Sequence, residues 1–162
     1  MFTTENNTVN TDIEFMRRAI ELAKSAAAIG EIPVGALVVK SDTGEVISGA
    51  YNLRESEKSA TAHAEILAIE AACRRLGGWR LSGYTLYVTL EPCPMCAGAI
   101  VNSRIDRVVY GASDAFAGCC GSVMNFNAYP FSHAFEVSAR VCEDECREII
   151  QSFFEQRRKQ DK

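Results

Sequence analysis

The sequence predicts an α/β fold, a three-layer α/β/α sandwich around a five-stranded mixed sheet. Apolar residues at helical spacing alternate along the chain with short apolar runs typical of buried strands. Two early runs are joined by a short polar turn, which indicates an antiparallel hairpin. The later runs are separated by helical segments, so helices are expected to cover both faces of the sheet.

Length and composition fit one globular domain. The chain has 162 residues, of which 48% are hydrophobic and 23% charged. Its apolar runs are too short to span a bilayer, and its start (M-F-T-T-E-N-N-T) lacks the basic and apolar regions of a signal peptide. We therefore expect a cytoplasmic protein with a single domain over residues 11–159 and a flexible N-terminus over residues 1–10.

The first half of the chain predicts a helix followed by a hairpin. Residues 11–14 (T-D-I-E) have the pattern of a capping box, so a helix is expected to begin at Thr11 and to end at Gly30. Residues 33–40 predict a buried strand, residues 41–44 a turn and residues 45–51 the returning strand. Asn52 follows, either as a turn residue or as an amide that contacts a base, and residues 53–61 form a polar loop.

The second half alternates between helices and strands. Helices are expected over residues 62–76, 93–102 and 143–159. Strands are expected over residues 84–90 and 135–141, with a further strand between them that ends at residue 111. The segment 97–99 (A-G-A) allows close packing, either on the sheet or against another subunit. Residues 112–122 (A-S-D-A-F-A-G-C-C-G-S) follow a strand end, where sites of open α/β sheets form.

A metal site is predicted where the third strand meets its following helix. Cys93 and Cys96 are three residues apart at the start of this helix, so both sulfurs can face one point. The positive end of the helix favours their thiolate form. His63 begins the preceding helix, and both helices run antiparallel to the strand between them. All three side chains should therefore meet at one sheet edge, as ligands of a zinc ion that keeps a fourth position for water.

Glu65, two residues beyond His63, is expected to act beside this metal rather than to bind it. Zinc lowers the pKa of bound water towards ~7, and Glu65 would move protons from the water to the substrate. The pair H-x-E and P-C-x-x-C is the known signature of zinc nucleobase deaminases. The sequence thus predicts a hydrolase acting on a cyclic amidine with one zinc ion per subunit. Alternatively, the cysteines and the histidine could be ordinary core residues, but the presence of both motifs argues against this.

The remaining cysteines and the net charge carry less information. Seven cysteines, an odd number, argue against a disulfide framework. Cys142 and Cys146 share a helix face and could form a second metal site, although the lack of a neighbouring histidine favours buried thiols. The net charge of −4 differs from the basic charge usual in nucleic-acid-binding proteins. RNA binding would therefore need a local patch and a base pocket.

From about residue 15 to residue 159, the chain resembles the bacterial tRNA-specific adenosine deaminases of the cytidine deaminase-like superfamily. The resemblance lies in T-A-H-A-E (61–65), L-E-P-C-P-M-C-A-G-A-I (90–100), R-I-D-R-V-V-Y-G-A (104–112) and G-x-x-G-S (118–122). It implies hydrolytic conversion of adenosine to inosine at the wobble position of tRNA. It also implies a homodimer that binds the anticodon stem-loop, with no membrane or DNA partner.

The resemblance also implies roles for single residues outside the zinc motifs. Asn52 would hydrogen-bond the purine, and Asp114 would contact the ribose. His133, Phe154 and Arg158 would lie along the RNA loop. Two positions depart from the family pattern. Phe116 stands where D-x-K-x-G usually has lysine, and Ser132 precedes His133 where asparagine is frequent.

Two other functions compete with tRNA editing. A deaminase of a free base or nucleoside, of the guanine or cytidine type, would share the zinc motifs. Asp114 with its glycine loop and the basic C-terminal helix favour RNA instead. The second competitor is a catalytically silent RNA-binding subunit with structural zinc. Such a chain should lack Glu65 or have a fourth protein ligand, and this sequence shows neither.

Overall fold

The computed structural model describes residues 3–162; residues 1 and 2 lie outside the described part. Its elements in chain order are α1 (Thr3–Ala28), β1 (Gly35–Lys40), β2 (Val46–Tyr51), α2 (Ala64–Leu76), β3 (Tyr84–Leu90), α3 (Pro94–Ser103), β4 (Arg107–Ala112), the 3-10 turn η1 (Phe126–Ala128), β5 (Glu136–Ser138) and α4 (Glu143–Gln160). The strands form one sheet in the order β2-β1-β3-β4-β5. β1 runs antiparallel to β2 and β3, whereas β3, β4 and β5 are parallel. The predicted five-stranded mixed sheet is confirmed.

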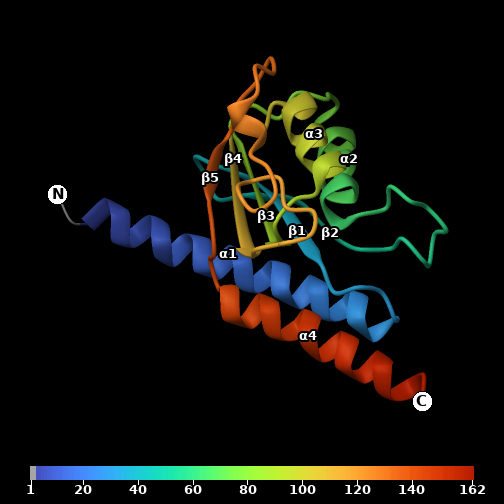
Figure 1. Cartoon of the computed structure of the whole chain (residues 1–162). Helices are drawn as coiled ribbons and strands as arrows, with labels where there is room; N and C mark the ends of the chain where they lie inside the picture. The colour runs from blue at the N-terminus through green and yellow to red at the C-terminus, as the bar shows by residue number, and fades with distance from the viewer. Residues whose placement is uncertain (1–2) are drawn as a thin grey trace.

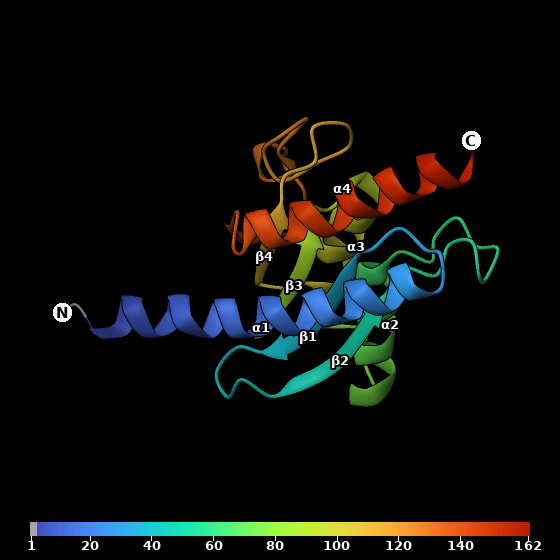
Figure 2. The same cartoon turned by 90° about the horizontal axis from the view of Figure 1, so that it is seen from below.

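Helices cover both faces of this sheet, which confirms the three-layer sandwich (Figure 1). Alternate residues of β1 point to opposite faces, as the strand period requires. Ala36 and Val38 pack in the core with α2 and α3, whereas Leu37 and Val39 pack in the core with α1 and α4. Seen from below, α1 and α4 lie together on the second face (Figure 2).

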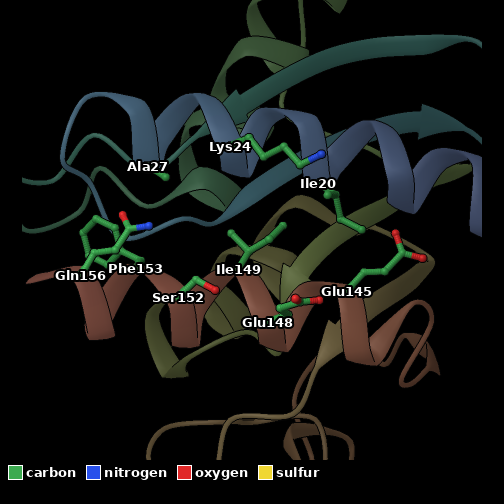
Figure 3. A pocket seen from close by; sticks show the side chains of 9 residues that line it. All are labelled: Ile20, Lys24, Ala27, Glu145, Glu148, Ile149, Ser152, Phe153 and Gln156. Carbon is green, nitrogen blue, oxygen red and sulfur yellow. The ribbon is translucent and has the colours of Figure 1, made fainter.

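The α1 and α4 layer lies close to the sheet and leaves a groove between its two helices. At Gly35, the first residue of β1, a side chain would overlap the α1 backbone at Ala19 and Ala23. A glycine is therefore required for this close approach. Between the helices, Ile20, Ile149 and Phe153 point into the groove, and Lys24 and Glu145 border it (Figure 3).

The first helix begins at Thr3, so the capping box expected at Thr11 is wrong. The Thr11 hydroxyl donates to the carbonyl of Asn7 at 2.8 Å, which is a bond within a helix rather than at its start. The neighbouring Asp12 is buried and accepts two hydrogen bonds from Arg107, at 2.9 and 2.6 Å, and one from Tyr87. Asp12 thus ties the interior of α1 to β3 and β4. The flexibility expected of residues 1–10 stays a prediction.

The fifth strand is shorter than expected. β5 covers three residues, although the pattern indicated 135–141. Arg140 and Cys142 adopt left-handed backbone angles, with φ of 63° and 53°, which end strand pairing. Among the described residues, no helix has both the length and the apolar character that crossing a membrane requires.

Candidate metal centre

Two helix N-termini bring the three expected metal ligands together. His63 is the N-cap of α2, Cys93 is the N-cap of α3, and Cys96 lies in the first turn of α3. Neither N-cap side chain bonds to its own helix, so both remain available to each other. The sulfurs of Cys93 and Cys96 lie 3.7 and 3.6 Å from Nδ1 of His63. The proximity expected from the antiparallel helix–strand–helix arrangement is confirmed.

These distances fit a zinc ion. Zn–S bonds of about 2.3 Å and Zn–N bonds of about 2.0–2.1 Å at tetrahedral angles place sulfur and nitrogen about 3.6 Å apart. The three ligand atoms all lie within 4.8 Å of one another. In the part of the chain that the structure describes, no other group of three His, Cys, Asp or Glu side chains has this geometry. Cys146 is buried against Gly111 of β4 and does not join such a group.

Contacts among the ligands favour metal binding at Cys93. A hydrogen bond from the Cys96 thiol lowers the pKa of Cys93 to about 4, with a further contribution from His63. The same contact raises the pKa of Cys96, because Cys96 keeps the shared proton. The contact with Cys93 raises the pKa of His63. Cysteine binds metals as the thiolate, so one ligand is already in its binding form.

Glu65 lies beside the ligands and is almost fully buried. It occupies the first turn of α2 and is 4% exposed. Burial raises the pKa of its carboxyl group to about 7. A carboxyl with a pKa near neutral pH can both accept and return a proton, which is the property of a general acid–base.

A cavity of ≈ 180 Å³ adjoins these groups at the edge of the sheet where β3 and β4 end. Its lining includes Ile32, Val34, Asn52, Arg54, His63, Ala64, Glu65, Leu90, Glu91, Cys93, Asp114 and Ala117. Two of the five expected substrate contacts, Asn52 and Asp114, are thus brought to the metal ligands. The structure does not bring His133, Phe154 or Arg158 into this cavity.

The other three residues lie elsewhere. Nε2 of His133 donates to the carbonyl of Ile105 at 2.7 Å, so that nitrogen is already used. Phe154 and Arg158 belong to α4, which lies across the sheet from α2 and α3. The C-terminal end of α4 and the loop over residues 53–61 nevertheless extend to the same side of the molecule in Figures 1 and 2.

Asn52 makes the hydrogen bonds of a turn residue and also lines the cavity, so its contact with a base stays a prediction. Its amide nitrogen donates to the carbonyl of Ile32 at 3.2 Å and to the carboxyl of Glu31 at 3.5 Å. Its oxygen accepts the backbone N–H of Arg54 at 3.3 Å, as in a turn. These partners fix which end of the amide is nitrogen and leave part of its oxygen free to face the cavity.

Two buried carboxylates that support the cavity walls were missed by the sequence-based predictions. Glu31 and Glu91 are each 1% exposed and hold the two loops that border the cavity. Burial raises the pKa of Glu31, but hydrogen bonds from Ser56 and Glu55 outweigh it and lower the pKa overall. Neither residue stood out in the sequence, because a glutamate in a loop is ordinarily exposed and its bonds to distant backbone N–H groups leave no pattern.

Comparisons with known proteins match this geometry. The sequence profile of the cytidine and deoxycytidylate deaminase zinc-binding region matches residues 9–112. The chain is 51% identical over 149 residues to the tRNA-specific adenosine deaminase of Bacillus subtilis (strain 168). This alignment covers 91% of each protein. A solved structure from a study of A-to-I editing by tRNA:A34 deaminases aligns with a TM-score of 0.81 and 44% identity. That alignment covers 84% of this chain and 98% of the solved one.

A more distant solved structure shares the fold alone. The guanine deaminase from Nitrosomonas europaea aligns with a TM-score of 0.76 at 24% identity, over 85% of this chain and 81% of its own. The fold is therefore common to deaminases of different substrates, and the fold by itself does not select among them.

Proposed function

The chain belongs to the tRNA-specific adenosine deaminases, which are built on the zinc-binding region of cytidine and deoxycytidylate deaminases. From this membership we infer that it hydrolyses adenosine to inosine and ammonia at the wobble position of tRNA. The buried Glu65 beside His63, Cys93 and Cys96 at zinc-binding distances supports hydrolytic deamination, and the 51% identity to a tRNA-specific adenosine deaminase supports the tRNA substrate. The deaminase domain is proposed to span residues 11–159.

We propose that His63, Cys93 and Cys96 hold zinc, the cofactor of this family. Zinc, when bound, lowers the pKa of a water molecule towards ~7 and so supplies a nucleophile at neutral pH. Glu65 takes one proton from this water and delivers it to a ring nitrogen of the adenine. It then carries the second proton of the same water to the exocyclic amine, whose bond to the purine carbon breaks so that ammonia leaves, while the water oxygen stays on that carbon. The burial that raises the pKa of Glu65 suits a group that must both gain and lose a proton.

Asn52 and Asp114 are proposed to hold the nucleoside in the cavity. The free part of the Asn52 amide is available to the purine, and the Asp114 carboxylate is available to the ribose. His133, Phe154 and Arg158 are proposed to contact the RNA outside the cavity. The shared direction of the α4 end and the 53–61 loop supports a substrate much larger than a nucleoside.

The partner and location of the enzyme are part of the same proposal. With a net charge of −4, binding is expected to depend on a flipped base in a pocket rather than on overall attraction to phosphate. We propose the anticodon stem-loop as the bound part of tRNA and a homodimer as the active form. At Gly98 the surface of α3 is open, which leaves room for a second subunit. We place the enzyme in the cytoplasm as a prediction.

Activity on different substrates tests this function. The zinc-loaded protein is incubated with an anticodon stem-loop containing adenine at the wobble position, and with free guanine, cytidine and adenosine. Ammonia and inosine are measured. Turnover of the stem-loop alone is expected. Turnover of a free base or nucleoside instead would move the enzyme to the competing metabolic class, and retained zinc without any turnover would support the silent subunit.

A further inference from the structure

A buried carboxylate outside the metal group lies directly under the loop that carries Asp114. Glu91 follows β3 and is 1% exposed. Its Oε1 accepts the backbone N–H groups of Cys120 and Ser122 at 3.0 and 3.1 Å. Its Oε2 accepts the backbone N–H of Asp114 at 3.0 Å and the hydroxyl of Ser122. One side chain therefore ties together both ends of the loop over residues 114–122.

The middle of this loop is also closed over Glu91. The N–H of Gly118 donates to the carbonyl of Asp114 at 3.0 Å. A Cβ atom on Gly118 would overlap the carboxyl group of Glu91 and the Asp114 carbonyl. Glycine at this position is what lets the backbone approach the carboxylate closely. The loop is thus shaped around Glu91 along its whole length.

These contacts determine how Asp114 faces the cavity. Its backbone N–H is held by Glu91, and its Oδ1 accepts the N–H groups of Phe116 and Ala117 at 2.9 and 3.2 Å. With the backbone and Oδ1 both fixed, Oδ2 is the carboxylate oxygen left without a partner in the loop. Asp114 lines the cavity, so Oδ2 is the atom available to a substrate hydroxyl.

We propose that Glu91 is a positioning residue for the deamination reaction. Its carboxylate holds the 114–122 loop against the end of β3 and so places the Asp114 carboxylate against the nucleoside. The proposal rests on the proposed function, since it takes Asp114 as a contact to the substrate. Four donors converge on Glu91, and only a side chain that accepts at both oxygens satisfies all of them.

The substitution Glu91→Gln removes one particular contact. Glutamine has one accepting oxygen and one donating nitrogen. If the glutamine nitrogen took the Oε1 position, it would face the backbone N–H donors of Cys120 and Ser122, and both hydrogen bonds would be lost. With nitrogen at the Oε2 position, it faces the Ser122 hydroxyl, which can turn to accept, and the Asp114 N–H, which cannot. The second orientation is favoured, so the variant specifically releases the backbone of Asp114.

The test is a double-mutant cycle on kcat/KM for the anticodon stem-loop. Glu91→Gln is expected to lower kcat/KM by about 10- to 100-fold, the loss that a small misplacement of a substrate contact causes. In an Asp114→Ala background, the same change is expected to cost less than about 2-fold, because Glu91 acts through Asp114. Zinc content should stay at one ion per chain. Equal losses in both backgrounds, or no loss in the wild-type background, would overturn the proposal.

Further variants separate positioning from general destabilisation. Ser122→Ala removes one bond to Glu91 but keeps the Asp114 contact, so it should lower kcat/KM much less than Glu91→Gln. If Glu91→Gln fails to fold, Gly118→Ala is used instead. Its added methyl group pushes the loop away from the carboxyl group of Glu91, which keeps its charge. This variant should show the same loss of kcat/KM, and the loss should again be small in the Asp114→Ala background. An equal effect of Gly118→Ala with and without the Asp114 carboxylate would count against the proposal.

Hydrogen exchange tests the contact without substrate. Amide exchange in residues 114–122 should be faster in Glu91→Gln than in the wild type, and unchanged exchange would refute the role of Glu91. If the loop loosens but the wild-type enzyme leaves the stem-loop unedited, the contact stands and the proposed function fails. If the wild-type enzyme edits the stem-loop but amide exchange in the loop of Glu91→Gln is unchanged, the proposed function stands and the role of Glu91 fails.

Discussion

Glu31 supports the opposite wall of the cavity, and its replacement by glutamine should destabilise the protein in a pH-dependent way. Its Oε1 accepts the N–H of Ser56 at 2.6 Å. Its Oε2 accepts the N–H of Glu55 at 3.3 Å and the amide of Asn52 at 3.5 Å. Glutamine should keep its oxygen on the shortest of these bonds, to Ser56. Its nitrogen then faces two donors, and two hydrogen bonds are lost.

The size of the effect follows from these two bonds. A hydrogen bond to a charged group contributes about 1.5–3 kcal/mol. Both lost bonds are long, so we expect a total of about 2–3 kcal/mol. For a chain of 162 residues, each kcal/mol shifts Tm by about 2–4 °C. The Glu31→Gln variant should therefore melt about 4–12 °C below the wild type at pH 7.

The difference between the two proteins should shrink in acid. Burial raises the pKa of Glu31, but the bonds from Ser56 and Glu55 outweigh it, and the folded pKa is lowered. A carboxyl with a lowered folded pKa stabilises fully above its unfolded pKa, about 4.3. It loses this contribution as the pH falls through the folded pKa. The Glu31→Gln variant has no such group. The difference in stability between the wild type and the variant should therefore be constant above about pH 5 and smaller at pH 3.5.

Thermal unfolding of both proteins from pH 7 to pH 3.5 provides the measurement. Loss of zinc in acid affects the two proteins alike, and only their difference is compared. Glu55→Gln is the matched control, because it removes an exposed charge in the same loop and should change stability by less than about 0.5 kcal/mol. A deficit of the same size at pH 3.5 and pH 7, or no deficit at pH 7, would refute this account of Glu31.

Three further predictions concern the metal centre and the pocket. Glu65→Gln should keep one zinc per chain and lower kcat by about 10²- to 10⁴-fold; normal turnover with normal zinc would remove Glu65 from proton transfer. Cys96→Ala should lose zinc by metal analysis, whereas Cys119→Ala, at a buried thiol outside the ligand group, should retain it; zinc retained by the first variant would exclude Cys96 as a ligand. Asn52→Ala should lower kcat/KM on the stem-loop more than it weakens RNA binding, and unchanged kinetics would leave Asn52 a turn residue only.

The metal ligands could be predicted because the relevant information is local. Each ligand sits at the start of a helix, and the direction of the strand between the helices determines that both starts share one edge. His63 and Cys93 therefore meet whatever the details of packing. The loop of Asp114 was expected at a site edge because it follows a strand, whereas the role of Asn52 was implied by the family resemblance alone.

The supporting glutamates could not be predicted in this way. Glu31 and Glu91 bond to backbone groups more than 20 residues away, and a backbone N–H carries no sequence signal. The start of α1 was mispredicted for a different, local reason. Thr11 and Glu14 have the spacing of a capping box, but the Thr11 hydroxyl bonds to the carbonyl of Asn7 inside a helix that begins at Thr3. Long-range hydrogen bonds explain only the two glutamates.

The three proposed metal ligands all come from one continuous segment, between residues 63 and 96. Zinc binding is therefore thermodynamically linked to the folding of that segment, and its binding free energy is added to the stability of the α2 and α3 layer. The α1 and α4 layer contributes no ligand from the described residues and depends on its own apolar contacts. Zinc depletion should then loosen the two layers unequally, with the pocket-bearing layer opening first.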